Sequence, residues 1–454
     1  MSLTPTTSLG PAFSRTDAAP VCLVCQAIDG CKADREKDAA LVAAVGQRTK
    51  KLIGWDVTDP SGADGGTCDK NWTACQSMAS EMGPRIQQFQ KYSDALPYAR
   101  AANDVNKLGD SPGNQSSGAK CVTRLSDSAE ELNKQLGLKP GTITDEDLRN
   151  DKTGFRAAVY RSDYDGSLIL VPRDTEPHSL VDWKTNTDNG QGKYTDQYAE
   201  MRNLTGVLDK SGVKFNLAGY SKGGGLAQEA GLVNPDAKVV VFNSAGIPET
   251  SVGRTATTML DSLAERTRSF SAEGDFLTYM NDTTDPAKQI ENARFLLSRL
   301  SGQGFPDPIS IDYSNPATLA AKQAQENALQ RATTIEEYGL PPSPDLMEAA
   351  AKDPDPALIE DRKQYLDDLK NLIDQKEKEA KEGKPVQLFP PVRTNDQETV
   401  PDSMSNVGWL FGARKDEANL GKLAQHQMSN VLDPMEKLVD KDRKSMQQFL
   451  KKCG

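Results

Sequence analysis

A serine flanked by glycines is the residue in this sequence with the clearest chemistry. Residues Gly219 to Gly223 follow the pattern Gly-x-Ser-x-Gly, with Ser221 at its centre. An apolar run from Phe215 to Ala218 precedes the pattern, and a proline-free, helix-forming stretch begins at Lys222. A sharp turn from strand to helix holds the serine hydroxyl clear of the backbone, and the glycines leave the room that the turn requires. Backbone N–H groups at the helix start would stabilise an oxyanion, so the pattern predicts acyl transfer through Ser221.

A nucleophilic serine needs a neighbouring base, and the sequence contains two histidines, His178 and His426. In α/β-hydrolases the catalytic residues follow the chain order serine, acid, histidine. His178 precedes Ser221 and does not fit that order. We therefore predict His426 as the catalytic base.

The catalytic acid is expected just after the strand that follows the elbow unit. Residues Thr267 to Ser271 alternate as a strand does, and Asp275 lies in the turn beyond them. Catalytic groups in open α/β sheets gather at the carboxyl ends of strands, so Asp275 is the predicted acid. Nearby Glu273, Asp282 and Asp285 remain alternatives.

Short apolar segments around the serine predict the strands that position it. Lys238–Phe242 follows the elbow helix, which gives a strand–elbow–helix–strand unit of a parallel sheet. Upstream, 155–160 and 167–171 predict a hairpin joined by a two-residue Asp165-Gly166 turn. A helix between Tyr194 and Leu208 is expected to pack on the sheet through residues at three- and four-residue steps, namely Tyr198, Met201, Leu204 and Leu208. We expect an α/β-hydrolase fold with a central, mostly parallel sheet.

A family resemblance rests on the segment between the hairpin and the elbow. An Arg-x-Thr at 173–175, an Asp-Trp at 182–183, an amphipathic helix and then the elbow resemble class 3 lipases and related lipase-like α/β-hydrolases. The resemblance covers roughly residues 150 to 285 and 400 to 440. It implies an oxyanion hole formed by Thr175 with the Lys222 backbone N–H. Asp174 stands where the family usually has glycine, and the elbow has Tyr220 and Lys222 where many lipases have histidine and leucine.

Six of the seven cysteines fall in the first 121 residues. The six are Cys22, Cys25, Cys31, Cys68, Cys75 and Cys121, and the seventh is Cys453. Such a cluster predicts up to three disulfides among these six in an oxidising compartment. Reduced thiols are one alternative, and a zinc ion at Cys22-x-x-Cys25 is another, although the region has no histidine and no second Cys-x-x-Cys.

Composition excludes several classes of partner. A net charge of -11 and a pI near 5.0 argue against nucleic acid and against simple attraction to anionic lipid. We find no phosphate loop and no metal-ligand cluster, and therefore expect no cofactor and no metal. No apolar stretch is long enough to span a bilayer, and the first residues lack the features of a signal peptide.

The combination of a cysteine-rich N-terminal region and no signal peptide resembles that of antibacterial lipase effectors of the type VI secretion system. That resemblance implies synthesis in the bacterial cytoplasm and secretion by a dedicated machine. It also implies action on phospholipid in the periplasm or at the membrane of a target cell. The implied partners are an immunity protein and a secretion-apparatus or chaperone protein.

The chain divides into four predicted regions: a cysteine-rich, mostly helical part over 1–150, the first part of the hydrolase core over 151–285, a helical insertion over 286–385, and a return to the core over 386–454. Within the insertion, Leu358 to Ala380 predicts a charged helix that either packs on the body or forms a lid. The predicted function is a serine lipase or phospholipase. The alternatives are an esterase or thioesterase on a soluble substrate, and a non-catalytic binding protein on a hydrolase fold.

Overall fold

A computed structural model describes most of the chain. It covers residues 21–53, 72–108, 118–175, 180–190, 192–273, 356–384, 392–401 and 428–453, with eight single positions between 275 and 294. Its helices include α1 (Val21–Ile53), α2 (Trp72–Asp104), the 3-10 helix η2 (Val105–Lys107), α3 (Ala129–Gln135), α4 (Asp145–Leu148), α5 (Leu180–Gly190), α6 (Asp196–Lys210), α7 (Lys222–Val233), α8 (Glu249–Arg254), α9 (Thr257–Arg266), α15 (Pro356–Lys381) and α17 (Ser429–Cys453). None of these described helices is long and apolar enough to cross a bilayer.

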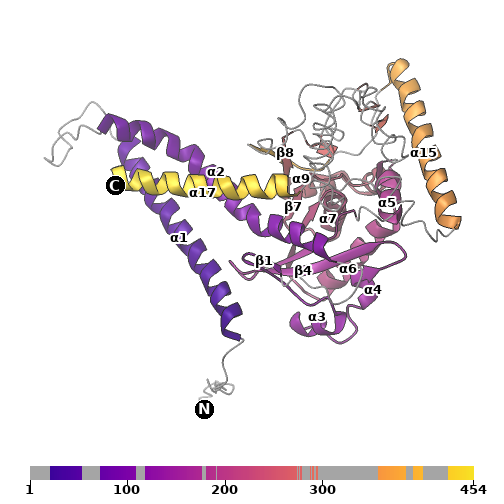
Figure 1. The fold of residues 1–454 in the computed structure, drawn as a ribbon, viewed down its shortest axis with the longest axis horizontal. Helices are drawn as coiled ribbons and strands as arrows, with labels where there is room; N and C mark the ends of the chain where they lie inside the picture. The colour runs from indigo at the N-terminus through magenta and orange to yellow at the C-terminus, as the bar shows by residue number, and fades with distance from the viewer. Residues whose placement is uncertain are drawn as a thin grey trace, which may run out of the picture.

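One mixed sheet forms the centre of the body that lies on the right in Figure 1. Its strands in the described ranges are β1 (Gly118–Ala119), β2 (Val122–Arg124), β3 (Arg149–Asn150), β4 (Phe155–Ser162), β5 (Leu168–Pro172), β6 (Phe215–Tyr220), β7 (Val239–Phe242), β8 (Thr267–Ala272) and β9 (Asp396–Val400). The order is β1-β2-β4-β5-β6-β7-β8-β9, and β3 pairs with β4. Strands β5 to β9 are parallel, whereas β1 to β4 pair antiparallel. The expected α/β class with a mostly parallel sheet is confirmed.

Helices cover both faces of the sheet, which explains why strands β5 and β7 are apolar throughout. In β7, Val239 and Val241 belong to one buried cluster, and Val240 and Phe242 belong to the other. Helices α6, α7 and α9 contribute to the first cluster, and α1, α2 and α17 to the second. The predicted buried face of α6 is confirmed, because the four residues that form it are at most 1% exposed, namely Tyr198, Met201, Leu204 and Leu208.

The β4–β5 hairpin is confirmed, but its expected two-residue turn is wrong. Ser162 N–H donates to Ser167 O at 2.8 Å, so the loop spans four residues between them. Asp163 contacts the β1–β2 side of the sheet: its N–H donates to Cys121 O at 3.0 Å, and its carboxylate accepts a hydrogen bond from Thr123 of β2. Gly166 then closes the loop at φ 76°. A contact with a neighbouring strand therefore decided the loop length.

Two disulfides join segments that are far apart in the sequence. Cys75 of α2 pairs with Cys453 of α17, and Cys31 of α1 pairs with Cys121 in the turn between β1 and β2. Helices α2 and α17 pack side by side, so the start of one lies next to the end of the other (Figure 1). The prediction of disulfides is confirmed for these four residues, but pairing within the N-terminal cluster is wrong for Cys75. The other three cysteine side chains lie outside the described residues.

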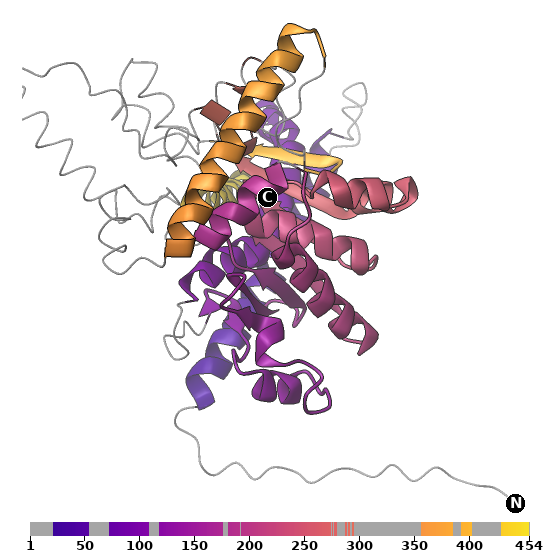
Figure 2. The ribbon, with the colours of Figure 1, turned by 90° about the vertical axis from the view of Figure 1, so that its right-hand side faces the viewer.

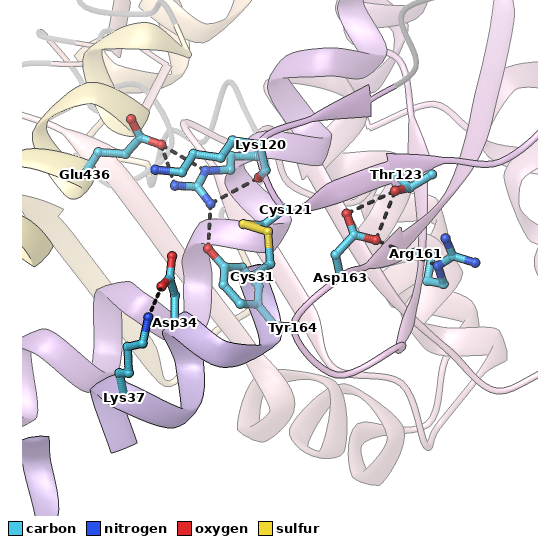
Figure 3. Close-up of a disulfide and its surroundings, with 11 residues drawn as sticks. Cys31, Asp34, Lys37, Lys120, Cys121, Thr123, Arg161, Asp163, Tyr164 and Glu436 are labelled. Atoms are coloured by element: carbon cyan, nitrogen blue, oxygen red, sulfur yellow. Dashed lines mark hydrogen bonds and ion pairs between the residues drawn. A yellow bond between two sulfur atoms is a disulfide. The ribbon is translucent and has the colours of Figure 1, made fainter. Parts of the chain in front are cut away.

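Polar contacts support the Cys31–Cys121 connection (Figure 3). The buried Arg100 side chain of α2 donates to Lys120 O at 3.1 Å and to the Tyr164 hydroxyl at 2.7 Å, and it forms an ion pair with Glu436 of α17 at 2.7 Å. One guanidinium therefore connects α2, α17 and two loops at the antiparallel end of the sheet.

The predicted charged helix at 358–380 is confirmed as α15, which lies beside α5 (Figure 2). Ile373 of α15 is 1% exposed, and Glu377 forms an ion pair with Arg294. A lid role for the 286–385 region remains a prediction. Strand β9 was not predicted from the sequence, because Asp396 to Thr399 are polar and lack the pattern of a buried strand.

Candidate active site

Ser221 lies at the turn from β6 to α7 in a strained backbone conformation. Its φ of 52° and ψ of -123° place it, with Cys121 and Asn243, among the described non-glycine residues with positive φ. Such a conformation costs about 1–3 kcal/mol and persists only where the surroundings enforce it. Here Ser221 N–H donates to Phe242 O at 3.0 Å, and Ser221 O accepts from Ala245 N–H at 2.9 Å. The strand, sharp turn and helix predicted from the sequence are confirmed.

The glycines of the elbow allow α7 to begin in close contact with its neighbours. A Cβ at Gly219 would lie 2.1 Å from Gly223 O, and one at Gly223 would lie 2.7 Å from Pro172 O. A Cβ at Gly224 would lie 2.2 Å from Ser244 Oγ. Each distance is shorter than any side chain tolerates, so the first turn of α7 packs directly on the end of β5 and on the loop after β7.

Asp275, the predicted acid, is buried just beyond β8. Its backbone N–H donates to Ala272 O at 3.1 Å, and its Oδ2 accepts from Thr278 N–H at 2.7 Å. Burial raises the pKa of Tyr220 well above its ordinary value, with smaller contributions from Asp174 and Asp275. Both carboxylates therefore lie near the residue that precedes Ser221. The alternative Glu273 is exposed, whereas Asp275 is 2% exposed; Asp282 and Asp285 lie outside the described residues.

The predicted oxyanion residues lie on two adjacent segments. Thr175 follows β5, and its hydroxyl accepts a hydrogen bond from the Asn186 amide of α5 at 2.9 Å. The Lys222 N–H, the second predicted donor, donates to Asp174 Oδ1 at 3.1 Å. Asp174 N–H in turn donates to Asn106 Oδ1 of η2 at 3.1 Å. The aspartate in the usual glycine position thus contacts the very amide that the resemblance assigned to the oxyanion.

The Lys222 side chain takes part in a buried charge cluster that the sequence did not predict. Its Nζ lies 2.6 Å from Asp182 Oδ1, and Arg173 lies 4.0 Å from Asp182 Oδ2. Asp182 is 0% and Lys222 is 3% exposed. Burial lowers the pKa of Lys222, and the neighbouring Asp182 carboxylate opposes that change. In the sequence, the indication is a lysine directly after the nucleophile at a tightly packed helix start, because a buried charge requires a partner of opposite charge.

The predicted base, His426, lies outside the described residues, as does His178. Described residues close to His426 in the sequence, before 402 and after 427, pack near the elbow. Val400 at the end of β9 and Met428 before α17 belong to the same buried cluster as Tyr220.

Among the described residues, no three His, Cys, Asp or Glu side chains gather as a metal site requires.

A family model described as a Tle-like phospholipase domain matches residues 98–325, which is half of the chain. The chain belongs to the Tle-like phospholipase family. No curated protein matches it. The phospholipase-like match begins within α2 and includes β1 to β8, the elbow and Asp275. The predicted resemblance to type VI lipase effectors is therefore confirmed, and lipid is the substrate class of the Tle-like phospholipase domain.

Proposed function

We propose that this Tle-like phospholipase hydrolyses acyl esters of membrane lipids through Ser221, His426 and Asp275. The observation that carries the proposal is the strained Ser221 at the β6–α7 turn, held by backbone hydrogen bonds with Phe242 at the end of β7 and with Ala245 just beyond it. A strained residue at a glycine-packed elbow is typical of a nucleophile, because the strain serves to present its hydroxyl.

In the proposed mechanism, Ser221 Oγ attacks the ester carbonyl while His426 accepts the hydroxyl proton. Collapse of the tetrahedral intermediate expels the alcohol, which receives that proton, and water then releases the fatty acid by the same steps. Asp275 orients the imidazole and stabilises its charged form. The Lys222 N–H and Thr175 stabilise the oxyanion. The buried position of Asp275 just past β8 supports its role over that of the exposed Glu273.

The proposed base is tested by comparing the two histidines. We expect His426→Ala to abolish fatty acid release from phospholipid vesicles and His178→Ala to retain it. Ser221→Ala should be inactive as well. Equal release by wild type and Ser221→Ala would end the proposed mechanism. Reaction of Ser221 with a fluorophosphonate, but with hydrolysis confined to soluble esters or thioesters, would favour the esterase alternative, and an inert chain would favour a binding protein.

We also propose that the protein is an antibacterial effector of the type VI secretion system that acts in the periplasm or at the membrane of a target cell. The two described disulfides support an oxidising compartment. The test is expression in a bacterial host with and without targeting to the periplasm. Growth should stop only when the protein is targeted to the periplasm and only when Ser221 is intact. Co-expression of an immunity protein should restore growth. Equal toxicity of the Ser221→Ala protein would contradict an enzymatic effector.

A further inference from the structure

Lys222 is the first side chain after the nucleophile that can hold the start of α7 in place. The next three residues, Gly223, Gly224 and Gly225, have no side chains, and their close contacts are with backbone and side-chain atoms of neighbouring segments. Glycine also gives the helix start more conformational freedom than any other residue. The Lys222 side chain is therefore the contact, beyond the backbone hydrogen bonds of Ser221, through which this helix start can fix the position of the Lys222 N–H.

That side chain binds Asp182, which is itself fixed from several directions. Asp182 lies in the first turn of α5, where the helix dipole favours a negative charge. Gln197 Nε2 of α6 donates to Asp182 Oδ1 at 2.6 Å and to Thr153 O at 2.5 Å. A Cβ at Gly154 would lie 2.7 Å from Asp182 Oδ1, so the backbone closes on the carboxylate from another side.

The same carboxylate faces the loop that carries the second predicted oxyanion residue. Arg173 is 4% exposed, lies 4.0 Å from Asp182 and donates to Leu108 O at 3.0 Å. Thr175 is two residues farther along. Asp182 thus connects the elbow helix, α5, α6 and the loop after β5. On the basis of the proposed function, we propose that Asp182 and the Lys222 side chain form a positioning pair that aligns the two halves of the oxyanion hole.

Three variants test the pair: Asp182→Asn, Lys222→Met and the double variant. Each single change leaves the buried cluster with one charge that is no longer balanced, so both stability and activity should fall. The double variant removes one buried charge of each sign, so the net charge of the cluster is unchanged, and its urea midpoint should return toward that of wild type. Its kcat on a soluble ester should stay about 100-fold low with KM nearly unchanged, because a small misplacement of catalytic groups has an effect of that size. Glu229→Gln, which alters the ion pair between the buried Glu229 of α7 and the partly exposed Arg202 of α6, is the control and should retain kcat.

Recovery of kcat together with stability in the double variant would overturn the proposal, since the pair would then be only structural. A folded Asp182→Asn protein with wild-type kcat would overturn it too. Hydrogen–deuterium exchange of the 219–226 segment gives a readout that needs no catalysis. Faster exchange in the double variant than in Glu229→Gln supports the positioning role, and equal exchange refutes it. A wild-type chain inert to fluorophosphonate would end the proposed function, while this exchange result would still decide the role of the pair.

Discussion

The Asp174 carboxylate accepts a hydrogen bond from the Lys222 N–H, the donor that the proposed mechanism assigns to the oxyanion. Its Oδ1 lies 3.1 Å from the Lys222 amide nitrogen, and both residues are buried. A substrate must displace this carboxylate before the amide can stabilise the tetrahedral intermediate. We therefore predict that Asp174→Gly raises the rate of reaction at Ser221. Glycine retains the backbone N–H that Asp174 donates to Asn106.

The size of the effect follows from the hydrogen bond that is lost. A hydrogen bond to a charged group contributes about 1.5–3 kcal/mol, which corresponds to about 10- to 150-fold in rate if the substrate must break it. Asp174→Asn retains an acceptor without the charge and should therefore give a smaller increase. The order of rates should be glycine variant, then asparagine variant, then wild type.

The assay is the second-order rate constant for fluorophosphonate labelling, together with kcat/KM on a short-chain nitrophenyl ester. Asp165→Asn is the matched control, because the Asp165 carboxylate also accepts a backbone N–H, that of Ser167, but in the β4–β5 loop. Ser221→Ala measures the background. A folded Asp174→Gly protein that reacts at the wild-type rate or more slowly would refute the competition. A slower reaction would mean that the carboxylate helps to hold the site together.

Three further predictions concern stability. Gly223→Ala should lower activity, and it should lower the unfolding free energy by about 1–3 kcal/mol, because its Cβ would lie 2.7 Å from the carbonyl oxygen at the end of β5. Gly253→Ala, which has open space around it, should change neither, and equal urea midpoints for the two variants would contradict this. Replacing Cys31 and Cys121 together by serine opens a disulfide with a sequence separation of 90 and should cost about 2–4 kcal/mol in urea unfolding; unchanged stability would contradict that bond's role. Burial raises the pKa of the Glu229 carboxyl above its ordinary 4.5, so the folded state binds the carboxyl proton more tightly than the unfolded state does. The resulting stability is present below pH 4.5 and is lost as the pH rises through the folded pKa. The Tm of Glu229→Gln relative to wild type should therefore rise as the pH increases above 4.5, and a constant difference would exclude this linkage.

Local patterns in the sequence were sufficient to predict the elbow and its neighbours. The buried face of α6 follows from apolar spacing, and Ser221 follows from the glycines around it. These features depend on interactions within one helix or one turn, which a single sequence records directly. The prediction of a parallel sheet followed in the same way from the alternation of apolar strands and helices.

Features that depend on distant segments were harder to predict. The β4–β5 loop is longer than expected because Asp163 bonds Thr123 of another strand, and Cys75 pairs with Cys453 because α2 and α17 pack together. Strand β9 is polar at the edge of the sheet, where only one side needs to be paired. The sequence distinguishes Asp182 by the tryptophan that follows it, but its partner lies 40 residues away in the sequence, at Lys222. Buried charges therefore require three-dimensional information that spacing does not give.

Lys222 is held by a carboxylate at each end, and the two carboxylates should have opposite effects. Asp174 binds the amide, which the substrate needs, whereas Asp182 binds the ammonium, which the substrate does not contact in the proposed mechanism. Loss of the first should raise the rate at Ser221, and loss of the second should lower it. A general loss of stability would lower the rate in both cases. The sign of the two effects, measured on folded proteins, therefore separates competition and positioning at the oxyanion hole from simple damage to the fold.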